Sequence, residues 1–187
     1  MPDTDVGGGD VDINTDEQRF TELYHRHHTA VANYVRRRTA SDDVTDVVSE
    51  VFLTAWRRLD EIPPAKALPW LYGVARRTLA NAHRSQRRRG TLTEMLAAQP
   101  RHLVDDEADS VIVDLSLARA FDALSDADQE VLRLAVWEEL PARQAAAVLG
   151  CTAAAFHVRL HRARTRLRNH LSPAQQAPQT SLGRADA

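Results

Sequence analysis

The chain has 187 residues, a net charge of −2 at pH 7 and a single cysteine, and it is long enough for one medium domain or two small ones. A lone cysteine excludes an internal disulfide and a cysteine-based metal cage, and no apolar stretch approaches the length of a membrane-spanning helix. Because the N-terminus also lacks the pattern of a secretion signal, we expect a protein of the cytoplasm that does not enter the membrane.

Apolar residues begin to recur at helical spacing after residue 16, which predicts a first helix over 17–38. Three histidines in this helix, His25, His27 and His28, are its only feature that resembles a metal site. Neither a cysteine nor a paired acidic ligand lies near them, so we expect no metal site here.

A second helix, N-capped by Ser41, is predicted by apolar residues that recur at helical spacing for four turns up to Leu59. Opposite this stripe, Asp46, Ser49 and Glu50 are spaced three and four residues apart and form a small acidic face. Such a face fits the basic side chains of a protein partner, although acidic faces are common on surface helices.

A third helix is predicted over 67–88. Five arginines fall on the arc opposite its apolar residues: Arg76, Arg77, Arg84, Arg87 and Arg88. Guanidinium groups gathered on one face repel one another unless a polyanion relieves them, so the arc suits a phosphate backbone. Four other side chains border the arc: Trp70, Tyr72, Asn81 and His83. Aromatic and amide groups suit unstacked bases, while Trp70 and Tyr72 would equally anchor the helix in its core.

Residues 91–113 have weak periodicity and contain a group of acids, which predicts a flexible acidic linker between two helical domains. Beyond the linker we expect a helix over 115–124 and a second one, capped by Ser125, that ends near Glu139. No segment has the alternation of a strand, so the predicted fold class is all-α.

The stretch from Leu140 to Arg168 has the spacing of a helix-turn-helix. Pro141 suits the first turn of one helix, Gly150 supplies the turn, and Thr152 can cap the next helix. That next helix has a narrow apolar stripe of Phe156, Leu160, Ala163, Leu167 and Leu171, with arginines and histidines around the rest. A solvated helix usually mixes both signs of charge, so this helix is predicted to bind DNA.

Four segments in this order resemble the bacterial extracytoplasmic-function sigma factors, which form group four of the sigma factors. The first reads DVTDVVSEVFLTAW from Asp43, and the second reads PWLYGVARR from Pro69. The third reads LSDADQEVLRLAVWEELP from Leu124, and the fourth reads AAAVLGCT from Ala145, followed by VRLHRARTRL. Each segment alone is loose, but four in order across two helical domains are specific. The resemblance covers about residues 20–171, excluding the linker.

The resemblance implies a subunit that directs core RNA polymerase to promoter DNA and initiates transcription, without a catalytic residue, cofactor or metal of its own. Relatives are usually held by an anti-sigma factor, which nothing in this sequence identifies. The implied organisation is a disordered N-terminus (1–16), a region-2-like domain for core polymerase binding and minus-ten recognition and melting (17–90), a linker (91–113), a region-4-like domain for minus-thirty-five recognition (114–171) and a disordered tail (172–187).

The same resemblance assigns three groups of residues. Core polymerase binding is implied for Asp46, Ser49 and Glu50. Minus-ten contacts are implied for Trp70, Arg76, Arg77, Asn81, Arg84, Arg87 and Arg88, and minus-thirty-five contacts for Thr152, Ala154, His157, Val158, Arg159, His161 and Arg162. The family commonly has glutamine where this chain has Ser49 and asparagine where it has Arg77, which leaves the base preference at minus ten open.

The alternative is a helix-turn-helix regulator with an N-terminal dimerisation or sensing domain. Such a protein would bind two half-sites of a duplex as a dimer, and it would have no need of the basic arc on the third helix. An enzyme is not expected, because the sequence contains no Ser-His-Asp pattern, glycine-rich phosphate loop or HExxH motif.

Overall fold

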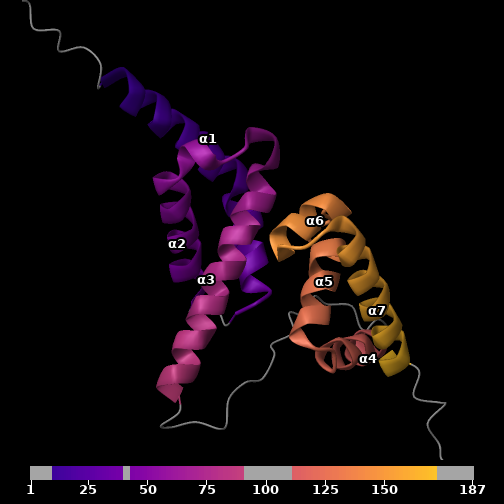
Figure 1. The fold of residues 1–187 in the computed structure, drawn as a ribbon. Coiled ribbons are helices and arrows are strands. Elements are labelled where there is room, and N and C mark those ends of the chain that lie inside the picture. The colour runs from indigo at the N-terminus through magenta and orange to yellow at the C-terminus, as the bar shows by residue number, and fades with distance from the viewer. Residues whose placement is uncertain (1–9, 40–42, 91–110, 172–187) are drawn as a thin grey trace, which may run out of the picture.

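The computed structural model describes residues 10–39, 43–90 and 111–171, and within them the chain forms helices and turns without a strand. The elements are α1 (Asp10–Arg36), α2 (Val44–Arg57), the short 3-10 helices η2 (Leu59–Glu61) and η3 (Pro64–Lys66), α3 (Ala67–Gly90), α4 (Val111–Asp122), α5 (Asp126–Val136), α6 (Ala142–Leu149) and α7 (Ala153–Leu171). The predicted all-α class is confirmed (Figure 1). None of the described helices combines the length and apolar character that a membrane span requires.

The helices form two groups, and each group buries its apolar stripes (Figure 1). In the first half, α1, α2 and α3 pack on one another and bury Val31, Val51 and Leu71 completely. In the second half, α7 packs on α4, α5 and α6, and its Phe156 is buried. A fully buried side chain of this size contributes about 1.5–3 kcal/mol, so burial of the stripes accounts for the packing of both halves.

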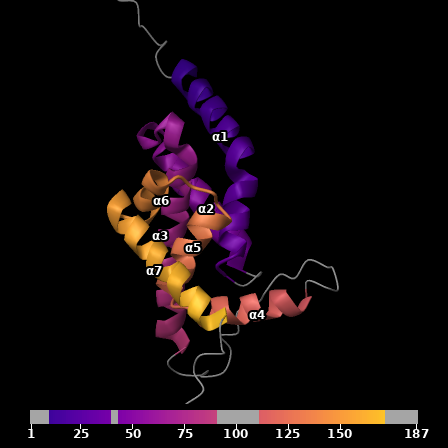
Figure 2. The ribbon, with the colours of Figure 1, turned by 90° about the vertical axis from the view of Figure 1, so that its right-hand side faces the viewer.

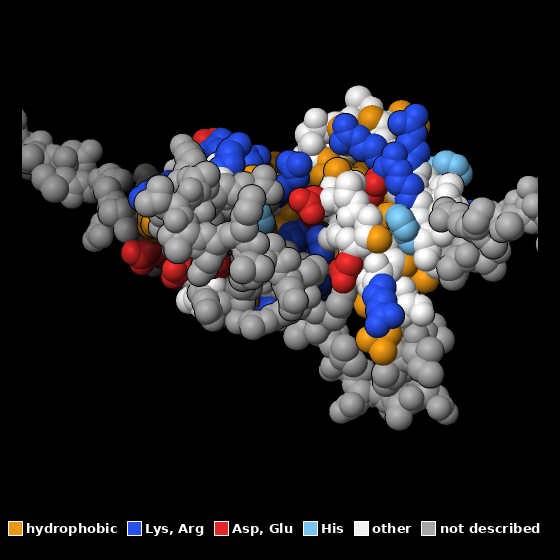
Figure 3. All heavy atoms as spheres, turned by 90° about the horizontal axis from the view of Figure 1, so that it is seen from below, with side chains coloured by type: hydrophobic (Ala, Val, Ile, Leu, Met, Phe, Trp, Pro, Cys, Tyr) orange, Lys and Arg blue, Asp and Glu red, His pale blue; other side chains and the backbone are white. Residues whose placement is uncertain are grey.

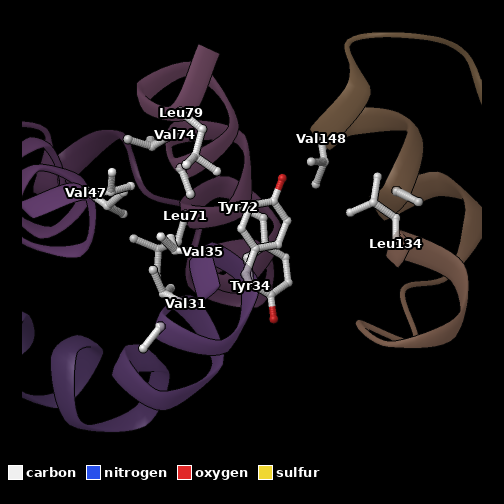
Figure 4. Packing of buried hydrophobic residues seen from close by; sticks show 14 of the residues in the cluster. Val31, Tyr34, Val35, Val47, Leu71, Tyr72, Val74, Leu79, Leu134 and Val148 are labelled. Carbon is white, nitrogen blue, oxygen red and sulfur yellow. The ribbon is translucent and has the colours of Figure 1, made fainter. Parts of the chain in front are cut away.

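The two halves also contact each other, because α6 lies against α3 (Figure 2). Figure 4 shows Tyr34 of α1 and Tyr72 of α3 between the apolar side chains of the first half and those of Leu134 and Val148 in the second. One continuous apolar cluster therefore includes residues of both halves.

The start of α1 differs from the prediction. The helix begins at Asp10, so residues 10–16, expected to be disordered, are helical. Asp16 accepts a hydrogen bond from Arg19 (2.8 Å), and the same arginine reaches Asp60 beyond α2 (3.1 Å). A contact across 41 residues leaves no local pattern in the sequence. The rest of the two predicted disordered ends, 1–9 and 172–187, lies outside the described residues.

Three other predicted boundaries shift by a few residues. The N-cap of α2 is Asp43, whereas Ser41 lies outside the described residues. The helix α4 starts at Val111, so residues 111–113, expected in the linker, are helical, and residues 91–110 are not described. The helix α5 ends at Val136 rather than near Glu139, because Glu139 adopts a left-handed backbone with φ of 48° that no α-helix continues.

The turn between α6 and α7 matches the predicted helix-turn-helix. Gly150 is left-handed (φ 64°, ψ 39°), and the N–H groups of Gly150 and Cys151 donate to the carbonyls of Ala147 (3.2 Å) and Ala146 (2.9 Å). This is a Schellman ending of α6. Thr152 then caps α7, since its hydroxyl accepts from the N–H of Ala155 at 3.1 Å. Pro141 is the N-cap of α6 rather than a residue of its first turn.

The left-handed turn predicts the effect of replacing Gly150. A Cβ at this position would meet no heavy atom within 4 Å, so the cost of Gly150→Ala is purely conformational. We expect the free energy of unfolding to fall by about 1–2 kcal/mol in urea denaturation. Gly150→Asn is the matched control, and it should lose less because asparagine tolerates left-handed backbone. Equal stability of the two variants would contradict this account of the turn.

Candidate nucleic-acid interface

The outer face of α7 consists of exposed side chains. Phe156, Leu160 and Ala163 are buried against the domain. Exposed residues cover the other side of the helix and its cap: Thr152, Ala154, His157, Val158, Arg159, His161 and Arg162. These are the residues assigned above to the minus-thirty-five element. A helix-turn-helix presents such a face, at the start of its second helix, to the major groove.

The arginines of α7 are not equivalent. Arg166 donates to the carboxylate of Asp128 at 2.6 Å, and the hydroxyl of Ser125 donates to the same carboxylate at 2.9 Å. Arg166 therefore fixes α7 to the start of α5. Leu171, expected in the buried stripe, is exposed instead, so the stripe ends before the last turn of the helix.

Basic side chains also gather in space. Figure 3 shows arginine and histidine side chains over the part of the surface that lies below α4, α5 and α7 in Figure 1. In the first half, Arg76, Arg77 and Arg84 are exposed on α3, opposite the buried Leu71 and Leu79. Arg84 donates to the side-chain oxygen of Asn81. The helix α3 continues through Arg87 and Arg88, whose side chains lie outside the described residues.

The two aromatic residues beside the arc on α3 have different surroundings. The side chain of Tyr72 is buried (3% exposed) and stacks on Tyr34 with ring centroids 4.6 Å apart. Burial raises the pKa of Tyr72 to about 12. The reading of Tyr72 as a base-stacking residue is therefore wrong, and its reading as a core anchor holds. Trp70 is half-buried, and the guanidinium of Arg58 lies 5.7 Å from its ring.

The acidic face of α2 continues into an apolar one. Asp46, Ser49 and Glu50 are exposed, and Leu53 and Trp56 follow at helical spacing with 43% and 41% exposure. Sequence reasoning missed this extension because Trp56 lies at the helical spacing of the apolar stripe, which was expected to be buried. The ring of Trp56 instead packs edge-on against that of Phe20 of α1, with centroids 5.1 Å apart, and part of the side chain remains exposed. Exposed apolar side chains bordered by polar groups are typical of a protein contact.

Two of the three histidines of α1, His25 and His28, belong to an aromatic group. The ring of His28 lies 4.8 Å from Tyr24, and the ring of His25 lies 6.0 Å from it. Within the described residues, no three histidine, cysteine or acidic side chains are grouped as a metal site would need. Packing on Tyr24 gives these histidines a structural role.

Two family models match the chain, one in each half. Residues 23–89 match Sigma-70 region 2, and residues 114–167 match Sigma-70 region 4. The first match includes the acidic face of α2 and the basic arc of α3, and the second includes the helix-turn-helix.

Relatives match across both halves. The chain is 33% identical over 150 residues to the probable RNA polymerase sigma factor RfaY of Xanthomonas campestris. This match covers 76% of this chain and 37% of the length of RfaY. It is 28% identical over 170 residues to the ECF RNA polymerase sigma-E factor of Escherichia coli (84% and 89% covered). The sigma-E factor of Haemophilus influenzae is 27% identical, with 84% and 90% covered.

Solved structures show the same fold. CnrH in complex with the cytosolic domain of CnrY matches with a TM-score of 0.59 and 25% identity, over 83% of this chain and 89% of that one. The sigma factor RpoE of Bartonella quintana, in complex with the anti-sigma factor NepR, matches with a TM-score of 0.63 and 20% identity, over 83% and 98%. With both regions matched in order, the chain belongs to the sigma-70 family of RNA polymerase sigma factors, in its extracytoplasmic-function group.

Proposed function

We propose that this chain is a group-four promoter-specificity subunit, which binds core RNA polymerase and directs it to promoters with a minus-ten and a minus-thirty-five element. The observation that carries the proposal is the presence of two separate exposed basic faces, on α3 and α7, in a chain whose α2 has an acidic and apolar protein-binding face. The polymerase performs the chemistry, and the subunit supplies no catalytic group.

At the minus-thirty-five element, α7 enters the major groove of the duplex. His157, Arg159 and Arg162 supply donors to base acceptors or phosphates. Ala154 and Val158 supply small apolar surfaces that fit thymine methyl groups. Thr152 and His161 border this group at the N-terminal end and on the outer side of the helix.

At the minus-ten element, the arc of α3 follows the backbone of an unstacked strand. Arg76, Arg77 and Arg84 neutralise phosphates, and Arg87 and Arg88 extend the same arc in sequence. Trp70 offers the open part of its ring for stacking, and Asn81 offers an amide to base edges. Because Tyr72 is buried, Trp70 is the aromatic residue assigned to this element.

The alternative of a dimeric regulator is not favoured. Its N-terminal domain would sense a signal or dimerise, whereas residues 23–89 match Sigma-70 region 2. A basic arc on α3 would also have no purpose in a sensing domain. The match to the two sigma-E factors covers 89–90% of their length, so it includes both of their halves.

Two further features of the proposal concern the cell. We place the chain in the cytoplasm, where bacterial RNA polymerase acts. The structurally similar sigma factor RpoE was solved in complex with the anti-sigma factor NepR, and CnrH was solved in complex with the cytosolic domain of CnrY. An anti-sigma factor is accordingly proposed as a partner of this chain as well.

The assignment of α7 predicts the behaviour of Arg159→Ala and Arg162→Ala. If the arginine contacts bases, its loss should weaken binding to duplex DNA by about 1–3 kcal/mol. If it contacts a phosphate, the slope of the logarithm of the binding constant against the logarithm of the salt concentration should become shallower by about one. Fluorescence anisotropy at several salt concentrations measures both quantities. Arg168→Ala, which removes the same charge from the far end of α7, is the control and should have a smaller effect. Unchanged affinity and an unchanged salt slope in both test variants would contradict the assignment of α7 as the helix that binds the minus-thirty-five element.

The assignment of α2 predicts the behaviour of Asp46→Arg. The wild-type chain should co-elute with bacterial core RNA polymerase in gel filtration, and the variant should not, because the reversed charge repels a basic partner surface. Glu22→Arg is the matched control, since it makes the same change at an exposed position of α1. A wild-type chain that does not co-elute, but binds duplex DNA as a dimer, would contradict the proposed function.

A further inference from the structure

The outer face of α7, assigned above to the minus-thirty-five element, has an apolar centre. Val158 is 49% exposed, and the other exposed large hydrophobic residue of this helix, Leu171, lies at its far end. Val158 is two positions from both Phe156 and Leu160, so it is rotated by about 200° from each of these buried side chains. It therefore points away from the domain. Exposure alone is common for an apolar residue, but this valine occupies the middle of the face assigned to DNA.

Ala154 extends this apolar centre by one turn toward the start of α7. It is exposed, and residues four apart on a helix are neighbours on the same face. We call Ala154 and Val158 the apolar strip. Neither side chain has a hydrogen-bond donor or acceptor. The two residues are about 6 Å apart along the helix axis, which corresponds to roughly two base steps of 3.4 Å. The strip is therefore long enough to face two neighbouring base pairs.

Basic and polar side chains border the apolar strip on both sides. His157 and Arg159 are exposed, and they are rotated by about 100° to either side of Val158. His161 and Arg162, also exposed, follow one turn later. No acidic residue occurs from residue 140 to residue 171. An apolar protein surface would fit the strip alone, whereas duplex DNA fits the strip together with its positively charged borders.

The fold holds the apolar strip in a fixed position. Thr152 caps α7 just before the strip, and Phe156 is buried (1% exposed) on the opposite side of the helix. Further along, Arg166 donates to Asp128 of α5 at 2.6 Å. Dispersion contacts weaken steeply when a gap of less than 1 Å opens between two groups. A helix anchored before, behind and beyond the strip gives the precision that such contacts require.

The apolar strip matches one chemical feature of the major groove. Base edges in this groove are hydrogen-bond donors and acceptors, and the exception is the C5-methyl group of thymine. 5-Methylcytosine presents a methyl group at the same ring carbon. A polar edge buried against alanine or valine loses its water without gaining a hydrogen bond, which costs free energy. A C5-methyl group gains free energy from the same burial.

We propose that the apolar strip reads the C5-methyl group of a pyrimidine in the minus-thirty-five element, and that Val158 distinguishes a methylated from an unmethylated pyrimidine there. This proposal rests on the proposed function and adds the chemical feature of the DNA that α7 selects. Promoters recognised by this chain should carry thymine at the base pairs that face the strip. 5-Methylcytosine should substitute for thymine better than cytosine does.

The first test removes the methyl group from the DNA. Holoenzyme made from core polymerase and the full-length chain selects fragments from random DNA, and the minus-thirty-five element that they share is placed in a synthetic promoter. Each thymine of that element is then replaced singly by deoxyuridine, which lacks only the methyl group. At one or two adjacent positions, the affinity measured by competition should fall about three- to fivefold, as expected for the loss of one buried methyl group.

The second test removes the apolar contact from the protein. Val158→Ser should bind the thymine and deoxyuridine promoters equally well. Because both changes act on one contact, their effects should not add, and a double-mutant cycle measures this coupling. Val158→Ile keeps an apolar, β-branched side chain and should retain the preference for thymine. Val136→Ser is the matched control, since it makes the same change at an exposed valine of α5, and it should retain the preference too.

The third test compares cytosine with 5-methylcytosine, each paired with guanine, at the position that couples to Val158. The wild-type holoenzyme should bind the methylated promoter about three- to fivefold more tightly, and Val158→Ser should bind both promoters equally. Equal binding of the two promoters by the wild type would overturn the reading of methylated cytosine.

Three results would overturn the proposal and leave the proposed function standing. The first is a shared minus-thirty-five element without thymine. The second is an element in which deoxyuridine replaces every thymine without loss of affinity. The third is a preference for thymine that Val158→Ser retains in full. A holoenzyme that selects no shared upstream element would instead contradict the proposed function, and this inference with it.

Discussion

The arrangement of the two halves depends on the surroundings of one buried side chain, Tyr34. Its ring stacks on Tyr72 of α3, the guanidinium of Arg38 lies 3.5 Å from its centroid, and its hydroxyl donates to Glu130 of α5. Burial raises the pKa of Tyr34 far above its usual range, so the hydroxyl keeps its proton and remains a donor. The same residue thereby completes the core of the first half and the contact with the second.

Position, rather than abundance, separates the arginines of this chain into two kinds. Arg38 and Arg166 are bound to carboxylates of α5 and hold elements together. Arg76, Arg77 and Arg162 are exposed on the faces proposed to bind DNA. Guanidinium groups suit both tasks, since they form strong charged pairs with carboxylates and with phosphates. A count of arginines therefore says little about function, whereas burial and partners distinguish the two kinds.

Helical periodicity was sufficient to predict most of the fold, because α2, α3 and α7 bury stripes that are visible in the sequence. It also located the turn at Gly150, where a local rule about left-handed backbone applies. Features that depend on distant partners were not predictable in this way. Tyr72 is buried by Tyr34, and Arg19 of α1 pairs with Asp60 beyond α2. Arg38 pairs with Glu130 and Glu138, which lie 92 and 100 residues further along the chain. The candidate DNA faces were accessible to sequence reasoning because each lies on a single helix.

The central claim is that this chain gives core polymerase its choice of promoters through two separate sequence elements. Sequencing the 5′ ends of transcripts made in vitro from a library of random DNA fragments, with core polymerase in the presence and absence of the chain, tests it most directly. The account predicts start sites that occur only with the chain and share two upstream elements, near minus ten and minus thirty-five. Start sites that are the same with and without the chain, or that share one palindromic element, would contradict it.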